Sequence, residues 1–332
     1  MFMTILVKFF RILVSIVIAA VCTVTSPVLG RFNSRITPVD KENVKLTFGT
    51  VSDIHIDGTF FKPFILEFCL EDFDKAETQL DAFVMVGDNT NMGQEKQYQT
   101  LKKSLDKYDL AKNIIMANGN HDTWTEDGIY DKAGPLFKKY ASEITGLDIQ
   151  KEYYSTKVNG YTFIVLGSEW RRTCAYFSQQ QLDWLEQELE TASKDGKPIF
   201  VFSHWPLNGT HGLPYSFEFD DTDPFEGGIG EQSDSVNEIL QRYKNIFFIN
   251  GHLHSGFKND KDKGLFKFQS IEKVGNITSI NVPSLMNFSI KGNIFNGTGY
   301  IFEVYDDEVV IRARNYATGI WLSNYDKTIE LV

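Results

Sequence analysis

Cysteine is scarce in this sequence of 332 residues, where Cys22, Cys69 and Cys174 are the three present and no CxxC occurs. This number and spacing exclude a disulfide framework and a zinc ribbon. A chain of this length can bury a full hydrophobic core without disulfide bonds, so we expect Cys69 and Cys174 to remain small, buried side chains. A disulfide between these two is the alternative if Cys22 leaves with a leader.

Positive charge is also in short supply, since 33 Lys and Arg face 44 Asp and Glu and the net charge is −11 at pH 7. Such a chain is poorly suited to gripping long nucleic acid, whose phosphates attract basic surfaces. A small anionic ligand would need metal ions to supply local positive charge. The 42% apolar fraction and the 27 Phe and 14 Tyr exclude disorder as the overall class.

The amino terminus combines basic and apolar residues. Lys8 and Arg11 precede the apolar run 12–21, which Ser26 and Pro27 follow. This pattern is typical of a secretory signal, and a retained membrane anchor is the alternative, because the run is short for a span. We therefore expect residues 1–30 to be a signal peptide or anchor and the protein to be exported, with membrane contact only if the segment is retained.

The rest of the sequence has no internal repeat and no composition break. Residues 31–43 are predicted to be a polar linker and residues 44–332 a single domain. Apolar runs alternate with helix-like segments, which predicts an α/β sheet, and Asn159-Gly160 and Asp306-Asp307 mark hairpin turns. The predicted strands are 44–51, 82–86, 114–117, 153–158, 161–166, 199–202 and 246–248, the predicted helices are 62–79, 94–108, 178–196 and 233–243, and the part after 258 is rich in strands.

Metal-binding residue types follow the predicted strands one after another, and five of the six histidines are among them. In a sheet of mainly parallel strands the carboxyl ends meet at one edge, so these side chains should share a site. Extended backbone would point Asp53 and His55 the same way, and likewise His252 and His254, because side chains alternate across a strand. The residues concerned are Asp53, His55, Asp88, Asn120, His121, His204, His252 and His254.

Without His121, this set offers seven nitrogen and oxygen ligands. Seven are too many for one tetrahedral ion but suit two ions that share a bridge. Asp88 can supply the bridge, because a carboxylate has two oxygens. Gly87, Gly119 and Gly251 each precede a ligand, which fits tight turns where backbone approaches the ions. The set contains no thiolate, so soft-metal and iron–sulfur centres are excluded, while Mn, Fe and Zn all remain suitable.

Five motifs in order resemble the calcineurin-like metallophosphoesterases: "DIH" (53–55), "GD" (87–88), "GNHD" (119–122), "SHWP" (203–206) and "GHLH" (251–254). The resemblance implies a four-layer α/β/β/α sandwich with a dinuclear metal centre. It also implies that His121 faces the substrate, with Asp122 orienting its ring. By the same resemblance one ion would take Asp53, His55, Asp88 and His254, and the other Asp88, Asn120, His204 and His252.

Departures from related groups narrow the comparison. Asn91 stands where purple acid phosphatases carry a tyrosine ligand, which argues against a purple iron centre. The sequence "GDNTNMG" lacks the Asp-Arg-Gly of protein Ser/Thr phosphatases. The segment "SQQQLDWLEQEL" before "SHWP" is similar to the group that contains class III cyclic-nucleotide phosphodiesterases and exported phosphohydrolases. That similarity does not identify a cyclic nucleotide as the substrate.

These observations favour a metal-dependent phosphoesterase that cleaves phosphodiester bonds in small molecules, with a metal-bridging hydroxide as the nucleophile and His121 assisting. One alternative is a phosphomonoesterase acting on nucleotides or sugar phosphates, because both reactions use the same centre. Another is a non-catalytic metal-binding scaffold, which would be expected to lack ligands. None of the expected ligands is missing.

Several further residues have two interpretations each. Arg171 and Arg172 either reach a substrate phosphate or form an ordinary surface pair. His211 and the loop 207–232 form either a lid or specificity wall, or a mobile acidic loop. Trp124 and Trp205 either stack on a leaving group or pack beneath the site. The oligomeric state is left open by the sequence.

Overall fold

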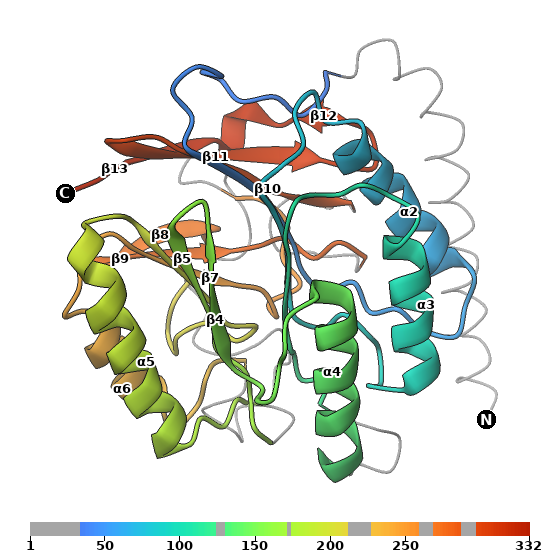
Figure 1. Ribbon diagram of the computed structural model, residues 1–332, viewed down its shortest axis with the longest axis horizontal. Coiled ribbons are helices and arrows are strands. Elements are labelled where there is room, and N and C mark those ends of the chain that lie inside the picture. Colours follow the sequence, from blue (N-terminus) through green and yellow to red (C-terminus); the bar gives the residue numbers. More distant parts are fainter. Residues whose placement is uncertain (1–33, 124–129, 171–173, 212–226, 259–267, 287–296) are drawn as a thin grey trace.

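The computed structural model describes residues 34–123, 130–170, 174–211, 227–258, 268–286 and 297–332. Two β-sheets lie face to face, and helices cover the outer face of each sheet (Figure 1). This arrangement confirms the four-layer α/β/β/α sandwich that the motifs implied.

The first sheet has seven strands. Its parallel part is formed by β1, β2 and β3, and β10 lies antiparallel to β1 on the other side. The strand order is β12-β11-β10-β1-β2-β3, and β13 also pairs with β11. The strands are β1 (Leu46–Val51), β2 (Ala82–Val86), β3 (Ile114–Ala117), β10 (Thr298–Val304), β11 (Glu308–Asn315), β12 (Ile320–Trp321) and β13 (Lys327–Glu330).

The second sheet has six strands in the order β4-β5-β6-β7-β9-β8. Its four inner strands are parallel, and the edge strands β4 and β8 pair antiparallel with β5 and β9. The strands are β4 (Tyr154–Val158), β5 (Tyr161–Val165), β6 (Ile199–Phe202), β7 (Ile246–Asn250), β8 (Ile271–Val274) and β9 (Ile277–Asn281).

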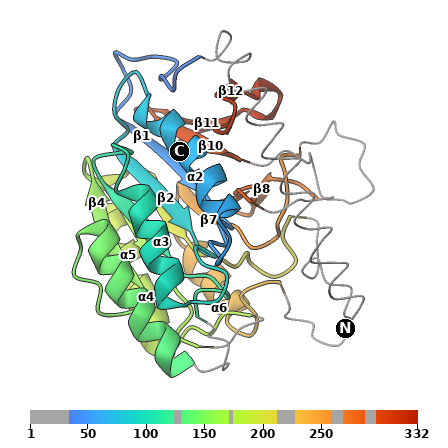
Figure 2. The same cartoon turned by 90° about the vertical axis from the view of Figure 1, so that its right-hand side faces the viewer.

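Helices α2, α3 and α4 cover the first sheet, as the turned view shows (Figure 2), and α5 and α6 cover the second (Figure 1). Two short 3₁₀ turns lie at Ser193–Asp195 and Ser323–Tyr325. The helices are α2 (Phe61–Asp74), α3 (Glu95–Leu105), α4 (Tyr130–Thr145), α5 (Gln179–Ala192) and α6 (Ser233–Leu240).

The layering follows from side chains that alternate along fully buried strands. In β2, Phe83 and Met85 pack toward the helices, while the alternate residues Ala82, Val84 and Val86 pack between the sheets. The space between the sheets is rich in aromatic rings: Phe48 stacks on Phe302 with ring centroids 4.4 Å apart. Both faces of the parallel strands are therefore apolar, and polar chemistry is left to the strand ends.

Most predicted elements are present within a few residues of their predicted ends. The helix predicted at 178–196 is α5, and Ser178 caps it, since its Oγ accepts a hydrogen bond from the Gln181 backbone N–H. Helix α4 was not predicted, because Gly134-Pro135 resembles a chain break. Phe137, Tyr140 and Ala141 on α4 are nevertheless buried against the first sheet, and this packing outweighs the cost of Pro135 near the start of the helix.

Residues 34–43 correct the prediction of a linker. The Arg314 guanidinium binds the Ser34 carbonyl, and Ile36 is 3% exposed within the core. The Val39 N–H donates to the Glu303 carboxylate. These residues are therefore packed onto the first sheet.

Two other expectations concern the cysteines and the leader. Cys69 and Cys174 are both buried thiols, which confirms the expectation for them. The predicted leader, residues 1–30, lies outside the described residues. Within the described ranges, none of the helices combines the length and apolar character that crossing a membrane requires.

Candidate metal centre

The predicted ligands lie where strands of both sheets end. Asp53 and His55 follow β1, Asp88 follows β2, and Asn120 follows β3. On the second sheet, His204 follows β6, and His252 and His254 follow β7. The apposed sheets thus bring residues separated by up to about 200 positions to one place.

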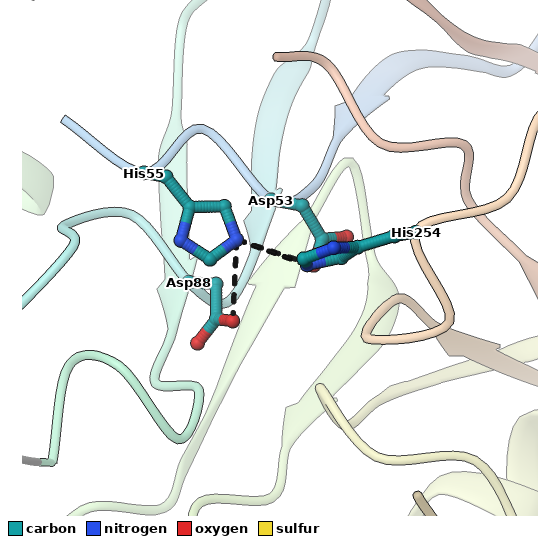
Figure 3. A group of neighbouring side chains, drawn as sticks. All are labelled: Asp53, His55, Asp88 and His254. Atoms are coloured by element: carbon teal, nitrogen blue, oxygen red, sulfur yellow. Dashed lines mark hydrogen bonds and ion pairs between the residues drawn. The ribbon is translucent and has the colours of Figure 1, made fainter. Parts of the chain in front are cut away.

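The first group consists of Asp53, His55, Asp88 and His254 (Figure 3). His55 Nε2 lies 3.0 Å from His254 Nε2 and 3.5 Å from Asp88 Oδ2. Asp53 Oδ1 lies 3.0 Å from His254 Nε2. Their ligand atoms all lie within 4.8 Å of one another, so one ion could contact all four.

The second group consists of Asp88, His204 and His252. His204 Nε2 lies 3.2 Å from Asp88 Oδ2 and 3.2 Å from His252 Nδ1. Asp88 Oδ2 therefore faces nitrogens of both groups, and this single oxygen is placed to be shared between two ions.

Both aspartates divide their oxygens between two tasks. Asp88 Oδ1 accepts a hydrogen bond of 2.8 Å from the His121 backbone N–H, which leaves Oδ2 for the ligand groups. Asp53 Oδ2 accepts one of 3.3 Å from the His252 backbone N–H, which leaves Oδ1. Each carboxylate therefore also holds a second loop of the site in place.

Three buried oxygens test whether these residues fit metal ions. Asp53 Oδ1, Asp88 Oδ2 and Asn120 Oδ1 accept no hydrogen bond within the described residues. The histidine nitrogens near the two carboxylates lie at ion-pair distances from them, 3.0–3.5 Å. Buried acceptors in this state are costly unless a ligand satisfies them. Unsatisfied carboxylate and amide oxygens that converge with imidazole nitrogens fit a pair of Mn, Fe or Zn ions.

The backbone that aims these ligands differs from the prediction. β1 ends at Val51 and β7 at Asn250, so neither Asp-x-His nor His-x-His is extended strand. The φ angles are instead positive: 55° at Asp53, 48° at His55, 68° at His252 and 43° at His254. Left-handed backbone costs about 1–2 kcal/mol for a residue with a Cβ. The predicted convergence is correct, but strained turns produce it rather than strand alternation.

Gly119 and Gly251 each precede a ligand, and neighbouring side chains of the site leave no room for a Cβ at either position. A Cβ on Gly119 would lie 2.2 Å from Asp88 Oδ1, and one on Gly251 would lie 1.9 Å from Ser52 Oγ, beside Asp53 Oδ2 at 3.0 Å. Real Cβ atoms do not approach other atoms so closely, so a larger residue would push the carboxylates out of position.

The His204 ring is held in a defined orientation, and its pKa is shifted in the opposite direction to the pKa values of His55 and His252. His204 Nδ1 donates to the Val86 carbonyl at 2.9 Å, which leaves Nε2 facing Asp88. Burial alone would lower the pKa of His204, but the Asp88 and Asp53 carboxylates raise it to about 9. Burial holds the pKa of His55 and of His252 well below 6.5. Without metal, a proton on His204 therefore partly balances the acidic groups, and metal would have to displace it.

His121 lies beside the first group, with its ring centroid 4.6 Å from that of His55. Its Nδ1 lies 2.8 Å from the Asn91 carbonyl oxygen. A carbonyl can only accept, so Nδ1 carries the hydrogen and Nε2 is left to face a ligand. This carbonyl could not be found from the sequence, because any residue type provides one.

Asp122 does not orient His121, which corrects the expectation from the resemblance. Its buried carboxylate accepts hydrogen bonds from the backbone N–H groups of Asn89, Thr90 and Gly119, and also from the Thr90 hydroxyl. Asp122 therefore joins the loop after β2 to the loop after β3. Burial, followed by the Asp88 charge, raises the pKa of Asp122.

The secondary candidates divide into buried residues and residues outside the described ranges. Trp205 is fully buried, with its ring 5.3 Å from that of His204, so it packs beneath the site. His211 is also fully buried and forms no exposed wall. Trp124, Arg171, Arg172 and residues 212–226 of the predicted loop lie outside the described residues.

Two ligand groups that share one carboxylate define a centre for two metal ions. A family model described as calcineurin-like phosphoesterase matches residues 46–256, which is more than half of the chain. The chain therefore belongs to the calcineurin-like phosphoesterase family. Family membership and the paired ligand groups together identify a dinuclear metal-dependent phosphohydrolase.

Solved structures share the fold. A dimetal phosphatase from Danio rerio has a TM-score of 0.57 at 14% sequence identity, covering 87% of this chain and 100% of its own. A purple acid phosphatase from yellow lupin (Lupinus luteus) seeds has a TM-score of 0.58 at 14% identity, covering 86% of this chain and 53% of its own. At this identity the likeness concerns the fold alone. A comparison with curated proteins finds no sequence match.

Proposed function

We propose that this protein hydrolyses phosphodiester bonds in small molecules. The observation that carries the proposal is the position of Asp88 Oδ2, which lies 3.5 Å from His55 Nε2 and 3.2 Å from His204 Nε2. Asp88 Oδ2 has no hydrogen-bond partner among the described residues, and the ligand atoms of each group lie within 4.8 Å of one another. Such an arrangement is suited to holding two ions at a phosphate ester.

The ligand assignment follows the two groups. One ion would be held by Asp53, His55, Asp88 and His254, and the other by Asp88, His204 and His252 together with Asn120. The family resemblance places Asn120 in the second set, and its buried Oδ1, which has no hydrogen-bond partner among the described residues, fits a ligand role. Two ions held this way would lower the pKa of a bound water and neutralise phosphoryl charge. Which metals bind depends on metal availability and on coordination geometry, and the donor atoms suit Mn, Fe and Zn.

His121 supplies the proton chemistry in this proposal. The Asn91 carbonyl fixes the ring so that Nε2, on the edge opposite the hydrogen-bonded Nδ1, is presented to the substrate. In its cationic form the ring carries a second proton, on Nε2, which can pass to the leaving oxygen and return the ring to its neutral form, a contribution worth about 10²–10⁴-fold in rate. The Asp88 carboxylate keeps His121 in register, because it binds the His121 backbone N–H.

Substrate size and location follow from the sequence. The net charge of −11 favours small phosphate esters over long nucleic acid. The basic and apolar segment within residues 1–30 favours export, either secreted or anchored at the membrane.

The test compares bis-p-nitrophenyl phosphate with p-nitrophenyl phosphate, using the full chain with added Mn²⁺ and with chelator. We expect metal-dependent hydrolysis that favours the diester. Preference for the monoester would instead support a phosphomonoesterase acting on nucleotides or sugar phosphates. Bound metal with no turnover of either ester would support a metal-binding scaffold and overturn the proposal.

A further inference from the structure

His211 is the one histidine of the six that the proposed site does not use. It is fully buried, and its Nδ1 lies 2.8 Å from the Gln269 carbonyl oxygen. Since a carbonyl only accepts, Nδ1 carries the hydrogen and Nε2 presents a lone pair. That lone pair faces two donors, Asn250 Nδ2 at 3.1 Å and Ser279 Oγ at 3.0 Å.

The hydrogen bonds continue from Asn250 to the loop that carries His252 and His254. Asn250 Oδ1 accepts from Asn281 Nδ2 at 2.7 Å, and the same Nδ2 donates to the Gly251 carbonyl at 2.6 Å. Asn281 Oδ1 in turn accepts from Ser255 Oγ at 2.5 Å. Asn281 therefore holds the loop 251–255 at both ends, on either side of the two histidines.

This loop has a reason to need support. His252 and His254 have φ angles of 68° and 43°, and such backbone persists only where its surroundings enforce it. The loop is also joined to the segment that carries His204, because the Gly251 N–H donates to the His204 carbonyl at 3.0 Å. His211, seven residues after His204, joins the same two segments at a second point.

We propose that His211, Asn250 and Asn281 form a positioning network that holds His252 and His254 in metal-binding geometry. The network rests on the proposed metal centre but takes no part in proton transfer. All three side chains are fully buried, so each lost hydrogen bond leaves a buried polar group unsatisfied. His211 contributes through its acceptor at Nε2, and this makes its role testable by substitution.

The two amide side chains imitate different edges of the histidine ring. Asparagine reaches about as far as Nδ1 and glutamine about as far as Nε2. His211→Asn can therefore keep the bond to Gln269 but loses Asn250 and Ser279, while His211→Gln keeps an acceptor for them. His211 itself has a φ of 59°, a conformation that asparagine tolerates better than glutamine. A merely structural role thus predicts that His211→Asn is the milder change, whereas positioning predicts that His211→Gln is milder.

The experiment measures Mn²⁺ affinity of the chelator-treated full chain by calorimetry, alongside thermal unfolding. We expect His211→Asn to weaken Mn²⁺ binding by about 10–100-fold, the range typical of residues that orient metal ligands. His211→Gln should stay within a few-fold of wild type. Tyr154→Phe is the matched control, because it loses buried hydrogen bonds to Met116 N and O (3.0 and 3.1 Å) away from the network. It should lower the unfolding temperature without changing Mn²⁺ affinity.

Wild-type affinity in His211→Asn, or stronger loss in His211→Gln than in His211→Asn, would overturn the network. If His211→Asn does not fold, Asn281→Leu tests the same idea, since it removes the bonds to Asn250, Gly251 and Ser255. Failure of the wild-type chain to bind Mn²⁺ is a different result and would contradict the metal centre itself. The readout is metal affinity, so it does not depend on which ester is hydrolysed.

Discussion

At the scale of single residues, the site depends on groups that bind two things at once. Asp53 and Asp88 each hold a backbone N–H of a neighbouring ligand loop with one oxygen and face the ligand groups with the other. Asp122 joins two loops in the same way without facing the ligands. The positions of the ligands are therefore coupled, and small changes beside them should have large effects on metal binding.

Replacing His121 with Ala should lower turnover by about 10²–10⁴-fold, because the proton donor to the leaving oxygen is lost. Metal content should stay at the wild-type level, since the bond from His121 to Asp88 uses only the backbone N–H. Steady-state kinetics and elemental analysis of the same preparation check both points. Loss of metal would contradict the assignment of His121 as a non-ligand.

Gly119→Ala should weaken metal binding by at least about 10-fold. The new Cβ would lie 2.2 Å from Asp88 Oδ1 and 2.4 Å from Asp88 N, so the shared carboxylate must move. Gly58→Ala is the matched control, because a Cβ at Gly58 meets no atom within 4 Å. Equal Mn²⁺ affinity of the two variants would show that Asp88 tolerates the displacement.

His211 should make stability depend on pH. Burial lowers its pKa from 6.5 to about 4, so between these values the unfolded chain binds the proton more strongly. Its contribution is fully present above pH 6.5 and is lost as pH falls to 4, by about 3 kcal/mol in total. Glu272, which accepts from the His211 backbone N–H, has a pKa raised by burial.

Urea unfolding of chelator-treated wild type and His211→Gln between pH 4 and 7 measures this effect. The stability advantage of the wild type should shrink as the pH is lowered. An advantage that is constant across this range would show that His211 does not titrate between the two states.

The residues that converge could be predicted from the sequence, but the geometry that aims them could not. Asp53, His55, His252 and His254 were identified from their place after apolar runs. Their left-handed φ angles depend on tertiary hydrogen bonds, such as His252 N–H to Asp53, which no local pattern reveals. Asn250 and Asn281 do share a sequence feature, because each follows an isoleucine at the end of a buried strand. In the structure the two asparagines pair in register.

At the scale of elements, strand ends position the chemistry and helices cover the sheets. The prediction of helix α5 agrees with its packing: Ser178 caps its start, and Leu182, Leu185 and Leu189 are buried on one face. Helix α4 was missed because Gly134-Pro135 locally disfavours a helix. The burial of Phe137 and Ala141, four residues apart on α4, stabilises the helix nevertheless. Local sequence signals therefore succeeded where they agreed with packing and failed where packing overrode them.

Ser178→Ala should lower the free energy of unfolding by about 1 kcal/mol, because the Gln181 N–H at the start of α5 loses the Ser178 hydroxyl as an acceptor and keeps only the Ser178 carbonyl. The Ser178 hydroxyl also donates to Glu169, which adds to the loss. Urea unfolding at constant metal content measures the effect. Ser193→Ala, at the opposite end of α5, is the control and should change stability little; an equal loss there would contradict the cap.

At the scale of the whole molecule, the two ends of the described chain complete the first sheet. β10 pairs with β1, and residues 34–43 pack against β10 and β11. The sequence predicted strands after residue 258 but not their pairing with β1, because such long-range pairing depends on the whole fold. The site lies between two sheets, and its ligands are contributed by both of them.

The central claim is that two ions share Asp88 and that turnover depends on both. The most direct measurement titrates Mn²⁺ into the chelator-treated full chain while following bis-p-nitrophenyl phosphate hydrolysis, beside Asp88→Ala. We predict that activity is absent without metal, saturates at about two ions per chain, and is lost with most of the bound metal in Asp88→Ala. Saturation at one ion per chain, or an active Asp88→Ala with full metal content, would contradict the claim.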